Sequence, residues 1–181
     1  VRGEGVDGAV LSDDAGNFML SVVNFGDETA VSEVLVYEVS GYIPAYRRVI
    51  AYPDVPVTAE PVFLKKYDSK ITPIGPAGGT ATSAAGDVEA DRRAGASSGT
   101  MAVQLTNYSA GRELPGPLPR ASAFTYAVDL APNGAAFSSP VTVKIANTLG
   151  FAPHTPVPVG VFNPETARWE PESMASISTD G

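Results

Sequence analysis

The sequence contains no cysteine, which excludes a disulfide framework and a thiolate metal site. Basic residues are few, 12 Lys and Arg against 20 Asp and Glu, and their scatter leaves no positive face for nucleic acid. No apolar run reaches the roughly 18 residues of a membrane span. No signal-peptide pattern opens the chain, so we expect any such peptide to have been removed or to lie upstream.

Glycine and proline are abundant, and helical periodicity is missing. The 18 glycines and 16 prolines are dispersed, and no window of helical length between them carries an apolar stripe. A hydrophobic content of 44% is enough for a core. The sequence therefore predicts an all-β protein, and its 181 residues suit one large domain or two small ones.

The stretch 135–170 shows the strand pattern most clearly. Alternating apolar side chains predict strands at 137–145 and 157–162, and Trp169 begins a third strand as the largest apolar group available for a core. Pro158 removes one backbone donor, which predicts an edge strand or a bulge. Asn163-Pro164-Glu165-Thr166 predicts a turn in which the Asn163 side chain bonds the backbone ahead of it.

The N-terminal third has the same character. Ser12 to Asn17 is a predicted hairpin loop, with Gly16 available for a positive φ. Further strands are predicted at Phe18–Val23, Val31–Val39, Tyr46–Tyr52 and Val57–Leu64.

Three motifs in this third carry a family resemblance. Asp14-Ala15-Gly16-Asn17-Phe18, Ser40-Gly41-Tyr42 and Val62-Phe63-Leu64 are similar to the carboxypeptidase-regulatory-like, transthyretin-like β-sandwich. That module follows carboxypeptidase catalytic domains and recurs in bacterial surface proteins. The resemblance implies a first domain over 1–67, with the family's first strand missing before Val1.

A second resemblance begins after a predicted linker at Asp68–Pro76. Pro76-Ala77-Gly78-Gly79-Thr80, Pro140-Val141-Thr142-Val143 and Val157-Pro158-Val159-Gly160 resemble the β-sandwich shared by zonula occludens proteins, netrin receptors and ankyrins. Arg93 departs from that pattern, which has proline there. The resemblance implies a second β-sandwich over 74–181, cut short at the Asp180-Gly181 turn signal. The fold expectation is thus two consecutive antiparallel β-sandwich domains.

This order of modules looks like the N-terminal region of large bacterial surface or secreted proteins, the YD-repeat (Rhs, teneurin-like) class above all. The resemblance implies a bacterial extracellular or cell-surface location and a non-catalytic stalk, plug or assembly role. The expected partners are neighbouring domains of a longer parent chain, or a second copy joined through edge strands. A carbohydrate-binding module and an accessory domain of a peptidase or YD-repeat toxin remain as alternatives.

No catalytic, cofactor-binding or metal-binding residue is assigned, and no cofactor is expected. His154, the single histidine, lies in a proline-rich loop and is predicted to be exposed. Asp13, Asp14 and Asn17 could offer oxygens to calcium, but their spacing is not that of an EF-hand, and turn formation explains the same residues. Whether they bind calcium stays open.

Three further features have a functional and a structural interpretation. Phe137-Ser138 matches part of a His-Phe-Ser self-cleavage motif of the netrin-receptor-like family, but Ala136 replaces the histidine, so cleavage is not expected. Exposed tyrosines on one sheet face could stack on a glycan, whereas alternating strand tyrosines also fill a sheet face. These tyrosines are Tyr37, Tyr42, Tyr46, Tyr52 and Tyr67. The acidic residues Asp129, Glu165 and Asp180 are predicted to be solvated.

Overall fold

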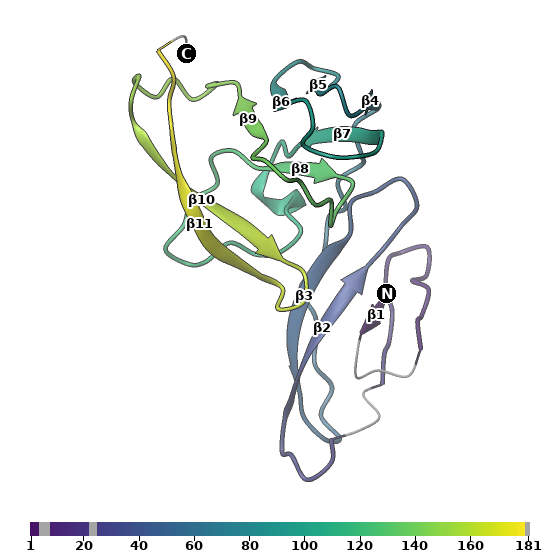
Figure 1. Ribbon diagram of the computed structural model, residues 1–181. Helices are drawn as coiled ribbons and strands as arrows, with labels where there is room; N and C mark the ends of the chain where they lie inside the picture. The colour runs from purple at the N-terminus through teal and green to yellow at the C-terminus, as the bar shows by residue number, and fades with distance from the viewer. Residues whose placement is uncertain (4–7, 22–24, 180–181) are drawn as a thin grey trace. The chain divides into compact units, whose positions relative to one another are not determined.

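A computed structural model describes residues 1–3, 8–21 and 25–179 of the chain, and in this part every regular element but one is a β-strand (Figure 1). The strands are β1 (Arg2–Gly3), β2 (Val31–Tyr37), β3 (Ala45–Ala51), β4 (Thr72–Ile74), β5 (Gly79–Thr82), β6 (Val88–Arg92), β7 (Met101–Asn107), β8 (Val128–Ala131), β9 (Thr142–Ile145), β10 (Pro156–Asn163) and β11 (Arg168–Ser176). The exception is one 3₁₀ turn, η1 (Gly111–Glu113). The prediction of an all-β protein is confirmed.

The strands form four small sheets. Three have three strands each, in the orders β1-β2-β3, β4-β7-β8 and β5-β6-β9, and every pairing defined in them is antiparallel. The fourth consists of β10 and β11. Among the described residues no helix is long and apolar enough to cross a membrane.

The chain divides into two compact units, and each is built from three separate segments. Unit 1 contains Val1–Lys65, Gly111–Ser122 and Gly160–Glu172. Unit 2 contains Lys66–Ala110, Ala123–Val159 and Ser173–Gly181. The units therefore interleave along the chain, whereas the sequence prediction places one domain after the other at 1–67 and 74–181. Those two domains stay a prediction.

Unit 1 is organised on both faces of the sheet β1-β2-β3. Leu35 and Tyr37 of β2 and Ala45 of β3 are buried on one face, where Phe18 and Leu64 pack against them. The other face carries Tyr46, because it neighbours Ala45 in a strand whose side chains alternate. The Tyr46 ring lies 5.4 Å from Phe162, measured between centroids.

Unit 2 has its core between two three-stranded sheets. Ile74 of β4 and Leu105 of β7 come from one sheet, and Ala81 of β5 and Val88 and Ala90 of β6 come from the other. All five residues are at most 6% exposed. This arrangement of two facing sheets buries alternate side chains of each strand, as the period-two pattern requires.

The predicted strands and turns of 135–170 are largely confirmed. β9 occupies the end of the strand predicted at 137–145, and β10 extends one residue beyond each end of the strand predicted at 157–162. Pro158 lies at an edge because β10 pairs with β11 alone. The Asn163 Oδ1 atom accepts hydrogen bonds from the backbone N–H groups of Glu165 and Thr166 at 2.9 and 3.3 Å. The turn chemistry expected from this asparagine is therefore present.

Trp169 lies at the start of β11, close to where the third strand was predicted to begin, but it is not a buried core residue. Its ring is half-buried, packs edge-on against Phe162 at 5.4 Å, and donates its indole N–H to the Gly116 carbonyl at 3.1 Å. The strand that follows is exposed at almost every position. A two-stranded sheet has no second layer along most of its length, so the largest apolar side chain finds a partner only near the turn.

Two strands predicted in the first third are corrected. β2 and β3 match Val31–Val39 and Tyr46–Tyr52, but Val57–Leu64 forms no strand. Pro61 removes a backbone donor from that segment, and Pro56 removes another just before it. The segment instead lays Val62 and Leu64 against the core of unit 1. The described part of Phe18–Val23, residues 18–21, is likewise not a strand, although Phe18 packs in the same core.

The predicted linker Asp68–Pro76 contains a strand. β4 occupies Thr72–Ile74 and pairs with β7 in the register Ile74 to Met101, and Ile74 is only 3% exposed. Pro73 is tolerated in this strand because β4 lies at a sheet edge. The C-terminal turn signal at Asp180-Gly181 lies outside the described residues.

Candidate binding site

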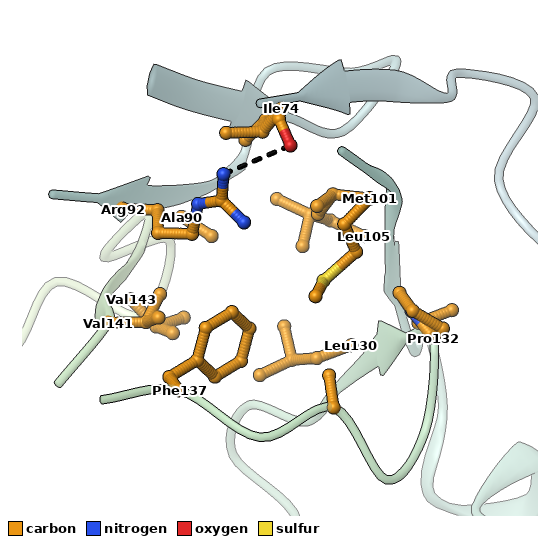
Figure 2. A pocket seen from close by; sticks show the side chains of 13 residues that line it. Ile74, Ala90, Arg92, Met101, Leu105, Leu130, Pro132, Phe137, Val141 and Val143 are labelled. Atoms are coloured by element: carbon orange, nitrogen blue, oxygen red, sulfur yellow. Dashed lines mark hydrogen bonds between the residues drawn. The ribbon is translucent and has the colours of Figure 1, made fainter. Parts of the chain in front are cut away.

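An apolar pocket lies between the two sheets of unit 2 and has a volume of about 200 Å³ (Figure 2). Its deep wall is formed by Ile74, Ala90 and Leu105, which are at most 6% exposed. Its rim is formed by Leu130, Phe137 and Val143, whose exposed fractions are 43%, 40% and 37%. The pocket therefore runs from open apolar side chains inward to buried ones.

The strand order explains why the space stays open. β8 and β9 are the outer strands of their sheets, β8 bonding only to β7 and β9 only to β6. Leu130 lies on β8, Val143 lies on β9, and Phe137 comes from the connection between these strands. No further strand bridges the two edges within the described chain, so the rim side chains stay exposed to solvent.

One charged side chain, Arg92 at the end of β6, lines the pocket. It is 3% exposed, and Figure 2 shows its guanidinium projecting from β6 toward Ile74 on one side of the space, with Phe137 and Leu130 on the other. The Nη2 group donates to the Ile74 carbonyl at 3.0 Å and to the Gly75 carbonyl. The Nη1 group donates to the Ser97 hydroxyl at 2.6 Å.

The Arg92 guanidinium is bonded only to neutral acceptors. Its buried Nε–H has no acceptor among the described residues, and no ion pair to Arg92 is formed there. A buried charge without a counter-ion is costly, and hydrogen bonds to neutral oxygens offset that cost only in part. The alternation Val88, Ala90, Arg92 is the sequence signal that could have placed this arginine on the core face.

Asp129 of β8 was predicted to be solvated, but the structure encloses it. It pairs in register with Thr106 of β7, its side chain is largely enclosed, and its Oδ2 atom is buried without a hydrogen-bond donor in the described chain. Burial raises the pKa of Asp129 to about 6. Glu165 is exposed, as predicted, and Asp180 lies outside the described residues.

The loop with Asp13, Asp14 and Asn17 is a tight turn closed by one carboxylate. Asp13 Oδ1 accepts the backbone N–H groups of Ala15 and Asn17, and Oδ2 accepts the Asn17 side-chain amide. These bonds, those from Asn17 foremost, lower the pKa of Asp13 below its ordinary value. Among the described residues, no three acidic or histidine side chains gather to hold a metal ion.

His154 and Ser138 lie in separate surroundings. His154 is exposed in its loop, as predicted, with φ of 65° and its backbone N–H bonded to the Ile177 carbonyl at 2.9 Å. The Ser138 hydroxyl donates to the Gly95 carbonyl at 3.1 Å, and its backbone N–H bonds the Ala96 carbonyl. The acceptor of this hydroxyl is a backbone carbonyl, which does not act as a general base.

The tyrosines of the first third do not share one face. Tyr37 is 6% exposed and packs edge-on against Phe18, while Tyr46 lies on the opposite face of the same sheet. Tyr42 and Tyr52 are 37% and 48% exposed, and Tyr67 is half-buried. A flat tyrosine platform of the kind that stacks on sugar rings is therefore not formed on β2 and β3.

A second hollow, about 330 Å³ in volume, lies in unit 1 beside Trp169. Arg48 and Arg168 line it together with the segment 117–119. The indole bond to Gly116 and the packing on Phe162 engage the Trp169 ring within the unit. Its lining is more polar than that of the unit 2 pocket, so the unit 2 pocket is the better candidate site for an apolar ligand.

Comparisons of the chain with models of protein families, with curated proteins and with solved structures give no match. The resemblances to the carboxypeptidase-regulatory-like and netrin-receptor-type modules therefore rest on sequence motifs and stay predictions. The structure defines an all-β protein with a small apolar pocket that is lined by one buried charged side chain, Arg92.

Proposed function

We propose that this chain is a non-catalytic β-sheet interaction module that adds a strand from a partner or a second copy to the open edge of β3. Its setting in a large bacterial extracellular or cell-surface protein, as two β-sandwich domains, is proposed from the sequence motifs alone. The observation that carries the proposal is the edge of β3, which is long, free of proline and only partly covered.

The hydrogen-bond pattern defines which backbone groups of β3 face outward. The Tyr46 N–H donates to the Pro115 carbonyl at 2.6 Å, so it points away from β2. Backbone direction alternates along a strand, and the N–H groups of Arg48 and Ile50 therefore point the same way. Neither has a backbone acceptor on that side among the described residues. Unpaired groups of this kind are a template for another strand.

The other sheet edges are less suited to strand addition. β4, β10 and β11 contain proline, while β5, β8 and β9 are only four residues long. β3 has seven residues without proline. Ile50 and the following Tyr52 are 52% and 48% exposed, so an added strand would gain apolar contact as well as backbone hydrogen bonds.

The test compares the variants Ile50→Pro and Ile50→Thr with the parent chain by light scattering over a range of concentrations. Proline removes the outward N–H at an edge position where the fold tolerates it, and threonine keeps the N–H and the β-branched shape. We expect the parent and I50T to associate as concentration rises and I50P to stay monomeric. Circular dichroism checks that both variants fold. A parent chain that is strictly monomeric, or an I50P variant that associates equally, would count against the proposal.

A further inference from the structure

The pocket of unit 2 combines apolar walls with a buried positive charge, and both features favour a ligand that has an apolar part and a negative charge. Its walls are apolar, and Arg92 brings a positive charge that is 3% exposed into them. Arginine has five N–H donors, and the described chain supplies acceptors for three of them, all neutral oxygens. A carboxylate is the partner that the guanidinium geometry favours, and it would neutralise the buried charge.

We propose that this pocket binds a small aliphatic monocarboxylate, with its carboxylate on Arg92 and its hydrocarbon chain toward Leu130, Phe137 and Val143. The proposal goes beyond strand addition at β3 and does not depend on it. It accounts for the buried positive charge of Arg92, which has no anionic partner among the described residues, and for the three exposed apolar side chains at the rim. Both features otherwise cost stability.

The volume limits the size of the ligand. A pocket of about 200 Å³ is smaller than the range of about 300–1,000 Å³ typical of drug-sized ligands. At roughly 30 Å³ for each water-sized group, it holds about seven non-hydrogen atoms. Pentanoate has that size. Longer chains would extend past the rim into solvent and gain little from added carbons.

The alternative is that Arg92 has a purely structural role, and the test must distinguish that role from ligand binding. Its bonds to the carbonyls of Ile74 and Gly75 tie the end of β6 to the end of β4, and such a clamp needs no ligand. A clamp and a ligand-binding group differ in one respect. Only a ligand-binding guanidinium changes its N–H resonances when a carboxylate is added.

The experiment titrates the whole chain with pentanoate at pH 7 and follows the Arg92 Nε–H resonance by ¹H–¹⁵N NMR. Pentanamide, which has the same number of non-hydrogen atoms and no charge, is the control ligand. We expect a saturable shift of the Nε–H signal with pentanoate and binding of pentanamide at least about tenfold weaker, because one charge-assisted hydrogen bond is lost.

Two alanine variants show where the ligand binds without touching Arg92. Ala135 lines the pocket, and its exposed neighbour Ala136 is not among the lining residues. We expect Ala135→Leu to abolish the pentanoate shift by filling the space and Ala136→Leu to retain it. The proposal is overturned if pentanoate gives no saturable shift, if pentanamide binds equally well, or if A135L binds as the parent does.

Discussion

Arg92 and Asp129 are the two charged residues that the strands of unit 2 enclose most, and they differ in what their neighbours supply. Arg92 keeps three donors bonded to neutral oxygens. The Asp129 Oδ2 has no donor in the described chain. The side of Arg92 follows from the alternation along β6. The burial of Asp129 does not follow from β8, because the apolar residues Val128 and Leu130 on either side place Asp129 on the outward face of that strand. Only the tertiary arrangement could reveal it.

Asp129 makes the stability of the protein depend on pH. Burial raises its pKa to about 6, above the value of about 4 in an unfolded chain. The folded state therefore holds the proton more tightly, and the free energy of unfolding falls as pH rises from about 4 through 6. We expect Asp129→Asn, which cannot ionise, to be more stable than the parent by up to about 3 kcal/mol at pH 7.5.

Urea unfolding at two pH values checks this expectation. The advantage of D129N over the parent should shrink greatly at pH 4, where the folded parent already carries the proton. Glu165→Gln, at an exposed position, serves as the control and should change stability little at either pH. An advantage of D129N that is equal at pH 4 and pH 7.5 would contradict a titrating buried carboxyl.

At the scale of elements, period-two alternation located β2 and β10. Exposed and half-buried side chains do alternate at the start of β10, whereas the last three residues of β2 are all buried. The strand predicted at Val57–Leu64 is absent. That segment does place Val62 and Leu64 on the core of unit 1, but it finds no strand to pair with. Local pattern tells which side chains face inward, whereas pairing depends on a neighbour that the local sequence does not encode.

The turn between β4 and β5 depends on a close backbone approach at Gly78. Its φ is 80°, and a Cβ atom there would lie 2.5 Å from the Arg92 carbonyl oxygen and 2.7 Å from the Ala94 nitrogen. Gly86 has a similar φ of 73° with open space around it. We expect Gly86→Ala to cost only the left-handed backbone penalty, about 1–2 kcal/mol, and Gly78→Ala to cost clearly more.

Thermal unfolding followed by circular dichroism measures both variants. Each kcal/mol corresponds to a lowering of Tm by about 2–4 °C in a protein of this size. The comparison isolates the steric term, because both glycines share the backbone conformation and differ in what surrounds the Cβ position. Equal Tm values for G78A and G86A would show that the turn moves to accept the extra carbon.

At the scale of the molecule, the interleaving of the two units is what the sequence could not show. The motifs that indicated a first domain all lie before residue 68, and nothing in the segments 111–122 and 160–172 marks them as parts of unit 1. The segments 111–122 and 160–172 join unit 1 through individual contacts with residues that are distant from them in the sequence. A pattern-based boundary can only fall between neighbouring stretches, so it cannot describe a unit assembled from three of them.

These distant contacts predict how the segment 1–67 behaves when it is produced alone. In the whole chain, the Tyr46 N–H bonds the Pro115 carbonyl at 2.6 Å, its ring packs against Phe162, and Lys65 pairs with Glu113 at 3.3 Å. The fragment lacks all three partners, which leaves one face of β2 and β3 uncovered.

We therefore expect the β2 and β3 amide protons of the fragment to exchange with solvent at least about a hundredfold faster than in the whole chain, equivalent to a loss of about 3 kcal/mol. Hydrogen exchange measured by NMR on both proteins tests this. Equal protection in the fragment would show that 1–67 is a complete domain and that the later segments only rest on it.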